Sequence, residues 1–148
     1  MSTYTEILYQ VVFSPKKRGA VLSKDNRDKL YRYFWGIFER RKCTLYEVGG
    51  IEDHVHFVFF LHPSVALASL IKEVKRNSNK FIKEEGLFPD FYAWQIGYSA
   101  FTYNQGAKKN LINYVKNQER HHKKEPSLQE LKRLLKENNI NYDEKYLE

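Results

Sequence analysis

The sequence predicts one α+β domain built on a four-stranded antiparallel sheet. Three observations support this prediction. The chain has 148 residues and an apolar fraction of 42%, which suffices for one domain with its own core. Four short segments rich in branched and aromatic residues have the length of strands. Together with two helical segments they follow in the order strand, helix, strand, strand, helix, strand, which is the split βαβ order of the ferredoxin-like sandwich.

The strands are expected at residues 5–13, 44–48, 54–61 and 95–103. In the first, alternate apolar positions make one face, namely Ile7, Tyr9, Val11 and Phe13. Gly49-Gly50 is expected to begin a turn after the second strand. The third strand reads HVHFVFFL and is apolar on both sides apart from its histidines. That pattern is typical of a central strand covered on both faces, and the topology places the first and third strands at the centre of the sheet.

The helices are expected at residues 24–42, 65–84 and 105–122, where apolar side chains recur at helical spacing. The first two are expected on one face of the sheet. After Pro126 the letters SLQE resemble a capping box, with Ser127 and Glu130 opening a short helix in the tail.

Composition narrows the possible partners. The net charge of +7 and the isoelectric point near 9.4 favour a polyanion such as nucleic acid. A single cysteine, Cys43, excludes an internal disulfide and a cysteine-rich zinc site, and it suits a reducing cytoplasm. The opening letters lack the layout of a signal peptide, and the longest apolar run, FVFFL, is too short to span a bilayer. We therefore expect a cytoplasmic protein without a membrane partner.

His54 and His56 point to the same side of their strand, because side chains alternate there. Three interpretations remain open: a structural pair without metal, a zinc site that would need further ligands, and an oxygen-preferring ion such as Mg²⁺ or Mn²⁺. His62 is no obvious third ligand, because it follows His56 by ~20 Å along an extended strand.

Tyr114 and Gln118 are four residues apart and should share one face of the third helix. Each side chain has an ordinary interpretation, packing for the tyrosine and solvation for the glutamine. Together they predict a phenol held one helical turn from a metal-binding amide. A tyrosine that attacks a metal-bound phosphate needs that arrangement.

Three segments, DHVHF, WQIGYSAF and YVKNQERHH, resemble the single-tyrosine HUH transposases of small bacterial insertion sequences and their relatives associated with repetitive extragenic palindromes. The resemblance extends over essentially the whole chain. It implies that His54, His56 and Gln118 bind Mg²⁺ or Mn²⁺ and that Tyr114 is the nucleophile, forming a 5′-phosphotyrosine. It also implies a homodimer acting on single-stranded DNA with hairpins at the element ends, without a small-molecule substrate, at the bacterial nucleoid. Residues 1–125 would form the catalytic domain, which includes the tyrosine helix, and residues 126–148 a helical tail.

Several further residues are candidates for DNA contact. They are Lys16, Lys17 and Arg18 after the first strand, and Lys72, Arg76 and Lys80 on the second helix. Asp53 and His121 are candidates for supporting the metal site from behind. Trp94 and Tyr98 would stack on unpaired bases or, as we prefer, pack in the core.

Rival functions stay open at this stage. One is a host-domesticated transposase, and another is a ferredoxin-like protein that binds single-stranded nucleic acid without catalysis. Other phosphodiester enzymes fit less well: many relaxases and some initiators carry a second catalytic tyrosine or a third clustered histidine, which we do not identify. The two-histidine phosphoesterases require a pair of H-x-[ST] motifs, which the sequence does not supply.

Overall fold

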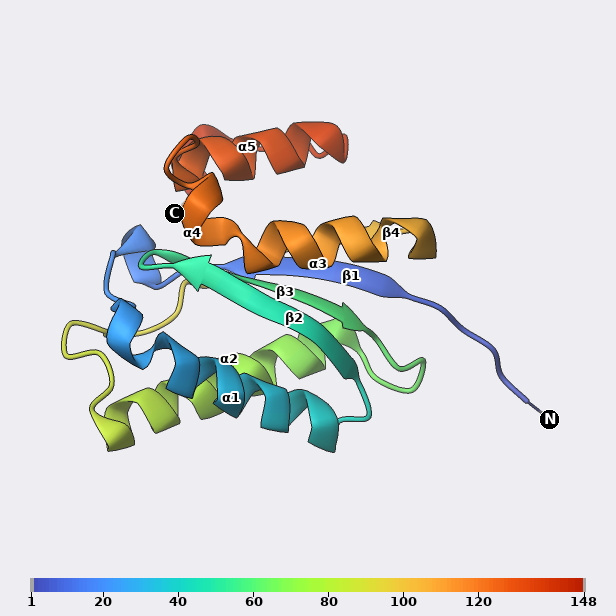
Figure 1. Ribbon diagram of the computed structural model, residues 1–148, viewed down its shortest axis with the longest axis horizontal. Helices are drawn as coiled ribbons and strands as arrows, with labels where there is room; N and C mark the ends of the chain where they lie inside the picture. Colours follow the sequence, from blue (N-terminus) through green and yellow to red (C-terminus); the bar gives the residue numbers. More distant parts are fainter. Residues whose placement is uncertain (1, 148) are drawn as a thin grey trace.

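The computed structural model describes residues 2–147 and contains the predicted sheet (Figure 1). Its strands are β1 (Leu8–Phe13), β2 (Thr44–Ile51), β3 (His54–Phe60) and β4 (Ser99–Tyr103). They lie in the order β2-β3-β1-β4, and every neighbouring pair is antiparallel. The two central strands are therefore β3 and β1, as the split βαβ order predicts, and the fold class is confirmed.

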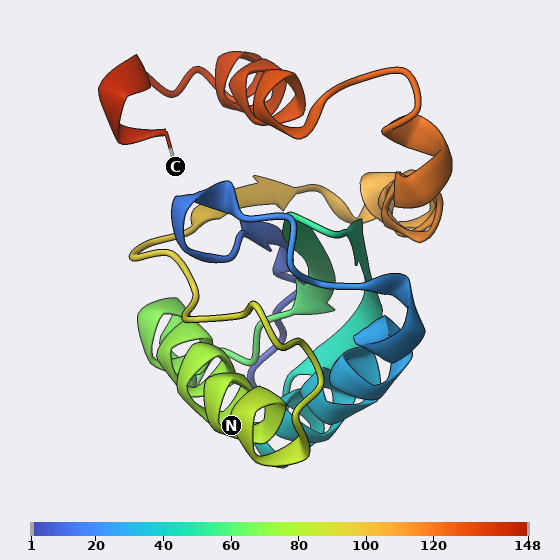
Figure 2. The ribbon, with the colours of Figure 1, turned by 90° about the vertical axis from the view of Figure 1, so that its left-hand side faces the viewer.

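One face of the sheet is covered by α1 (Lys24–Arg40) and α2 (Leu67–Glu85), which lie side by side beneath it (Figure 2). Alternation along β3 sends Val55, Phe57 and Phe59 into this layer. Phe57 meets Phe34 of α1 edge-on, with ring centroids 4.8 Å apart. The predicted apolar face of β1 joins the same core.

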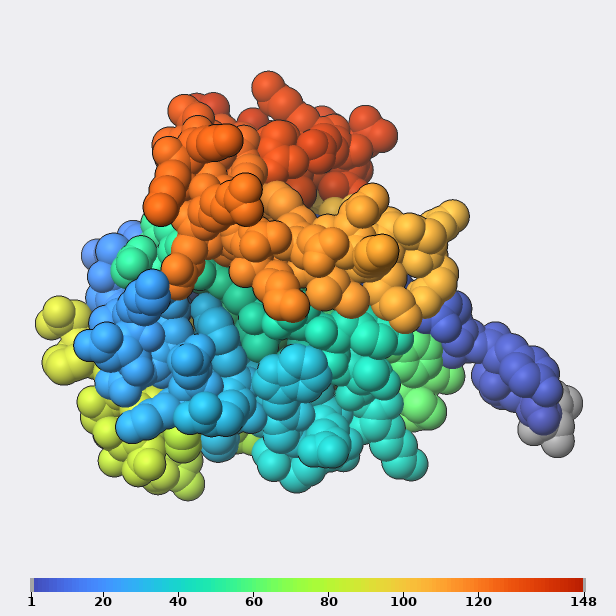
Figure 3. Space-filling view, in the orientation of Figure 1, coloured from blue at the N-terminus to red at the C-terminus, as the bar shows by residue number. Residues whose placement is uncertain are grey.

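The opposite face is covered by the segments after β4. They are η2 (Gln105–Ala107), α3 (Lys108–Lys116), α4 (Gln118–His121), α5 (Ser127–Glu137) and η3 (Glu144–Tyr146). Leu111 and Val115 of α3 pack on Leu8 and Val58. Leu131, Leu134 and Leu135 of α5 pack on Val12 and Phe101. Figure 3 shows the orange and red C-terminal segments as a layer over the rest of the molecule.

The predicted helix 105–122 is not continuous. It breaks at Asn117, whose φ of −101° and ψ of 24° are not helical, so α3 ends there and α4 starts at Gln118. The Asn117 side chain donates to the main-chain oxygen of Asn113 and so caps the end of α3. The fourth strand is also shorter than predicted, because the chain bends at residues 96 and 97 before it pairs with β1.

Gly49 and Gly50 lie inside β2, so the prediction that they begin a turn is wrong. The turn falls at Glu52 and Asp53. A side chain on Gly49 would overlap the main-chain oxygen of Val115 in α3, and one on Gly50 would overlap that of His54. Glycine is needed here because two backbones approach closely, which brings α3 down onto the sheet.

The capping-box interpretation of residues 127–130 is also wrong. Ser127 is the first residue of α5, and its hydroxyl donates to Asp53 instead of capping the helix. Glu130 is buried and turns toward the histidines of β3. Trp94 packs in the core beside Phe13, as preferred from the sequence. Within residues 2–147, none of the helices combines the length and apolarity needed to cross a membrane.

Candidate active site

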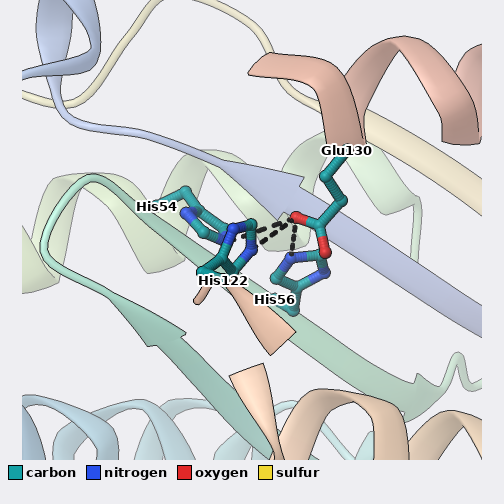
Figure 4. Close-up of side chains that lie close together, drawn as sticks. All are labelled: His54, His56, His122 and Glu130. Carbon is teal, nitrogen blue, oxygen red and sulfur yellow. Dashed lines mark hydrogen bonds and ion pairs between the residues drawn. The ribbon is translucent and has the colours of Figure 1, made fainter. Parts of the chain in front are cut away.

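β3 presents both histidines to the layer formed by α3, α4 and α5 (Figure 4). His54 is 1% exposed and His56 is fully buried, and their ring centroids are 4.9 Å apart. The strand alternation that sends Val55 and Phe57 into the core sends the histidines to the opposite side. Two buried imidazoles on one face therefore follow directly from the strand.

Tyr114 and Gln118 reach the same place from the α3–α4 segment. The side-chain oxygen of Gln118 lies 2.9 Å from His54 Nε2. The Tyr114 ring stands edge-on to His56, with centroids 5.8 Å apart. One chain thus brings together the four residues that the sequence singled out, despite the break at Asn117.

His122 and Glu130 complete the cluster, and neither was predicted there. Glu130 Oε1 lies 3.0 Å from His56 Nε2, 3.0 Å from His122 Nε2 and 3.4 Å from His54 Nε2. The ligand atoms of these three histidines and Glu130 all lie within 4.8 Å of one another. Imidazole nitrogens and a carboxylate at this spacing are suitable for binding a divalent metal ion.

Each histidine is held from behind by an oxygen. His54 Nδ1 donates to Asp53 Oδ1 at 2.8 Å, and His122 Nδ1 donates to the main-chain oxygen of Glu125 at 2.6 Å. His56 Nδ1 lies 2.8 Å from Gln10 Oε1. All three Nε2 atoms consequently point inward, which is the orientation that metal-binding histidines adopt. Asp53 lies where its predicted supporting role requires.

The buried charges shift the protonation of the cluster. Burial opposes the charged form of His54, but hydrogen bonds with Asp53 and Glu130 overcome it and raise the pKa of His54 to about 9. Burial lowers the pKa of His56 to about 4, so that ring stays neutral at pH 7. Burial also works against the Glu130 carboxylate, but hydrogen bonds from His122, His54 and His56 hold its pKa well below the usual range.

The Tyr114 hydroxyl donates to Glu130 Oε2 and accepts a hydrogen bond from Arg133 Nη2 at 2.9 Å. Burial and the neighbouring Glu130 carboxylate raise the pKa of Tyr114 above its ordinary value. His121 packs against the same phenol with ring centroids 5.2 Å apart, and its Nε2 lies 2.7 Å from Glu125 Oε1. The phenol is therefore protonated, half-buried and fixed by neighbours on two sides.

Solvent reaches Tyr114 from a surface hollow of about 330 Å³, which Arg120, His121 and Lys124 also line. Asn117 and Arg120 separate this hollow from a wider cleft of about 760 Å³ between α1, β2 and the α3–α4 segment. The cleft is lined by residues of both charges: the basic ones include Lys116, Arg120 and Lys123 near the tyrosine segment, and the acidic ones are Asp25, Asp28, Glu47 and Glu119. A negatively charged strand would meet positive side chains at the approach to the tyrosine.

The basic residues predicted to contact DNA divide into two groups. Lys72, Arg76 and Lys80 are exposed on α2, which covers the face of the sheet opposite to Tyr114. The second group is η1 (Lys16–Arg18), where Lys16 and Lys17 are exposed. Arg18 is half-buried beside His54 and Glu130, and burial lowers its pKa. Only the η1 group therefore lies near the cluster, and DNA contact by either group stays a prediction.

Comparison with known proteins bears on the family and the fold. A model of the family described as IS200-like transposases matches residues 3–118. A solved structure from Deinococcus radiodurans R1, provisionally described as a transposase, is 19% identical with a TM-score of 0.62, covering 80% of this chain and 95% of that one. A REP-associated tyrosine transposase bound to a REP hairpin is 16% identical with a TM-score of 0.60, covering 82% of this chain and 74% of that one. The comparison with curated protein sequences returned no match. At these identities the two structures establish similarity of fold.

Proposed function

Because the chain belongs to the family of IS200-like transposases, we propose that it cleaves and rejoins single-stranded DNA through a covalent bond to Tyr114. One observation carries the proposal: the Tyr114 hydroxyl shares a buried cluster with His54, His56 and Gln118. A tyrosine placed there only for packing would not need two imidazoles and an amide beside it.

The donor atoms of the cluster fit a divalent ion, Mg²⁺ or Mn²⁺, held by His54, His56 and Gln118. When bound, such an ion withdraws charge from the scissile phosphate and stabilises the departing oxygen. Other side chains of the protein position the ligands. Asp53 fixes the orientation of His54, and Gln118 is kept in place because its amide donates to Glu130 Oε2 at 3.1 Å.

Tyr114 acts as the nucleophile. Its oxygen forms a bond to phosphorus while the bond from phosphorus to the 3′-oxygen breaks, and that oxygen leaves with the electron pair and takes up a proton. The phenolic proton is given up to water, and the guanidinium of Arg133, 2.9 Å from the phenolic oxygen, stabilises the developing phenolate. The products are a 5′-phosphotyrosine and a free 3′-hydroxyl.

The covalent product explains how rejoining occurs without an energy source. The phosphodiester energy is kept in the tyrosine ester, so another 3′-hydroxyl can displace Tyr114 by the reverse reaction. The family relative bound to a REP hairpin supports a hairpin-containing single strand as the substrate. Exchange of two DNA ends requires two tyrosines, which supports a homodimer, because each chain supplies one.

A denaturing gel tests the proposal. The full chain is incubated with single-stranded hairpin DNA from the flanks of its own gene, in Mg²⁺ or Mn²⁺. We expect a denaturant-resistant protein–DNA adduct that disappears with EDTA and in Tyr114→Phe, while Tyr142→Phe serves as the matched control and retains it. Cleavage without an adduct would indicate a hydrolase instead. Binding without cleavage in any metal would indicate a non-catalytic protein.

A further inference from the structure

We propose that Glu130 and His122 are ligands of the same ion, and that the resulting nitrogen-rich site selects a transition-metal ion such as Mn²⁺ over Mg²⁺. This inference rests on the proposed function, because it concerns the ion that the function requires. It adds two ligands to the two histidines and one glutamine that the sequence motif indicates, and it assigns a role to α5.

The lone pairs of His54 and His122 point into the cluster. An imidazole nitrogen that faces an oxygen acceptor must carry the proton, and in the neutral ring the other nitrogen then presents a lone pair. His54 Nδ1 faces the Asp53 carboxylate and His122 Nδ1 faces the Glu125 main-chain oxygen. Both rings in their neutral form therefore turn a lone pair inward through Nε2.

The Nε2 atoms of His54 and His122 face side-chain oxygens of Gln118 and Glu130. Gln118 Oε1 lies 2.9 Å from His54 Nε2 and 2.8 Å from His122 Nε2, and Glu130 Oε1 faces the same two nitrogens. Gln118 and Glu130 direct only oxygen acceptors toward these nitrogens, because the Gln118 amide nitrogen instead donates to Glu130 Oε2. Either a proton on Nε2 or a cation among these atoms relieves the repulsion between the facing lone pairs, and a proton serves only one nitrogen at a time. A divalent ion would satisfy all of these donor atoms at once.

The Glu130 carboxylate is buried within the cluster. Glu130 is 2% exposed, and a buried carboxylate requires compensating positive charge. Arg133 on the same helix bonds to Tyr114, Glu125 and Glu137, while Arg18 lies beside His54 and Glu130. A metal ion among the histidines would place two further positive charges directly against this carboxylate and would also anchor α5 to β3.

The ligand set determines the kind of ion. Three imidazoles, one carboxylate and one amide oxygen give five protein ligands, so an ion that takes six keeps one position for a phosphate oxygen. Mg²⁺ prefers an all-oxygen environment, whereas first-row transition ions, including Mn²⁺ at the weak end of their affinity order, accept imidazole nitrogens more readily. We therefore expect Mn²⁺ to bind more tightly than Mg²⁺.

Glu130 could instead exclude the metal ion, and this alternative predicts the opposite effect of removing its charge. If its carboxylate merely occupied the place of the ion and excluded it, removal of the charge would strengthen metal binding. If Glu130 is a ligand, removal of the charge weakens metal binding. The sign of the change therefore separates the two roles.

The experiment measures Mn²⁺ binding to the full chain by the electron paramagnetic resonance of free Mn²⁺, without DNA. We expect one ion per chain, displaced only by a large excess of Mg²⁺. Glu130→Gln and His122→Asn should each weaken Mn²⁺ binding by about 10- to 100-fold. The matched controls are Glu137→Gln, exposed on the same helix, and His62→Asn, a half-buried histidine outside the cluster, and both should bind as the wild type does.

Pulsed electron paramagnetic resonance on the wild-type Mn²⁺ complex provides a second measurement that requires no variant. Three coordinated imidazole nitrogens are expected, and two would overturn the role of His122. Unchanged or tighter binding by Glu130→Gln would overturn the role of Glu130 while leaving the tyrosine mechanism intact. A wild-type chain that forms the DNA adduct but binds Mn²⁺ no better than Mg²⁺ would overturn the selectivity alone.

Discussion

Each histidine of the candidate site is fixed by the oxygen behind it. Asp53 accepts from His54, and the Glu125 main chain accepts from His122. Rings held in this way cannot rotate to offer the other nitrogen without losing a buried hydrogen bond. The inward direction of the donor atoms is therefore built into the protein before any ion arrives.

The hollow beside Tyr114 makes two basic residues the expected phosphate neighbours. We predict that the double variant Arg120→Ala/Lys124→Ala binds single-stranded DNA more weakly. Its plot of log affinity against log salt should be shallower by about 1.4, because each phosphate neutralised on a single strand adds about 0.7 to the slope. Fluorescence anisotropy over a range of salt concentrations measures this slope. The comparison variant Lys72→Ala/Arg76→Ala alters the α2 stripe, and a larger decrease there would place the DNA on the opposite face.

The lowered pKa of Lys75 should make the free energy of unfolding depend on pH in the alkaline range. Burial lowers its pKa from the ordinary 10.5 to about 8, and its amine donates to the main-chain oxygen of Gln95 at 2.9 Å. Between these two pKa values the unfolded chain binds a proton that the folded chain does not. The contribution of Lys75 to the free energy of unfolding therefore rises with pH in this window.

Urea unfolding of the wild type and of Lys75→Met at pH 7.5, 9 and 10 checks this expectation. The wild type should gain free energy of unfolding relative to the variant as the pH increases. A difference that stays constant, or that falls with pH, would show that burial does not depress this pKa.

At the scale of elements, the contact between β2 and α3 positions the nucleophile. Gly49 lets the main chain of β2 approach the carbonyl end of α3, one residue after Tyr114. The break at Asn117 then turns the chain so that Gln118 is buried against His54. These two features set where the tyrosine and the amide lie relative to β3.

Gly49→Ala tests that contact. Its methyl group would overlap the Val115 main-chain oxygen, so α3 must move outward, at a cost of about 1–3 kcal/mol. We expect lower stability in urea and slower formation of the DNA adduct. Gly36→Ala in α1 is the matched control: its methyl group meets only the end of Arg40 at 3.5 Å, and alanine should raise helix stability by about 0.5–1 kcal/mol. Equal stability and equal rates of adduct formation in the two variants would show that the contact between Gly49 and α3 does not position Tyr114.

At the scale of the whole molecule, every residue of the cluster comes from one chain. A homodimer built from such chains should contain two sites, each complete within its own subunit. We predict that mixing Tyr114→Phe with His56→Ala does not restore cleavage, because no subunit then has both a tyrosine and an intact histidine pair. Adduct formation by the co-refolded mixture measures this. Recovery of about a quarter to half of wild-type activity would show that subunits exchange the tyrosine helix.

The sequence was sufficient to predict the fold and four of the six residues of the cluster. The order of strands and helices is a local property, and His54, His56, Tyr114 and Gln118 stand in short motifs whose spacing is visible in the letters. Glu130 could not be predicted in the same way. It meets His56 from 74 residues away, and that contact exists only because α5 packs back on Val12 and Phe101.

The same limit explains the wrong predictions. Ser127 and Glu130 stand at capping-box spacing, but packing of α5 on the sheet gives their side chains buried partners with a greater need for hydrogen bonds. Gly49 and Gly50 look like a turn because the reason for two glycines lies in α3 and β3, not in their own neighbours. His122 was visible as half of a histidine pair, yet only the break at Asn117 turns it inward.

The polarity of the covalent bond shows whether Tyr114 attacks the scissile phosphate. Hairpin DNA labelled at its 3′ end and the same DNA labelled at its 5′ end are each incubated with wild-type protein and Mn²⁺, and the products are separated in denaturant. Attack by Tyr114 that leaves a free 3′-hydroxyl predicts that only the 3′-labelled DNA transfers its label to the protein. Label transferred from the 5′ end, or an adduct that persists in Tyr114→Phe, would contradict the account.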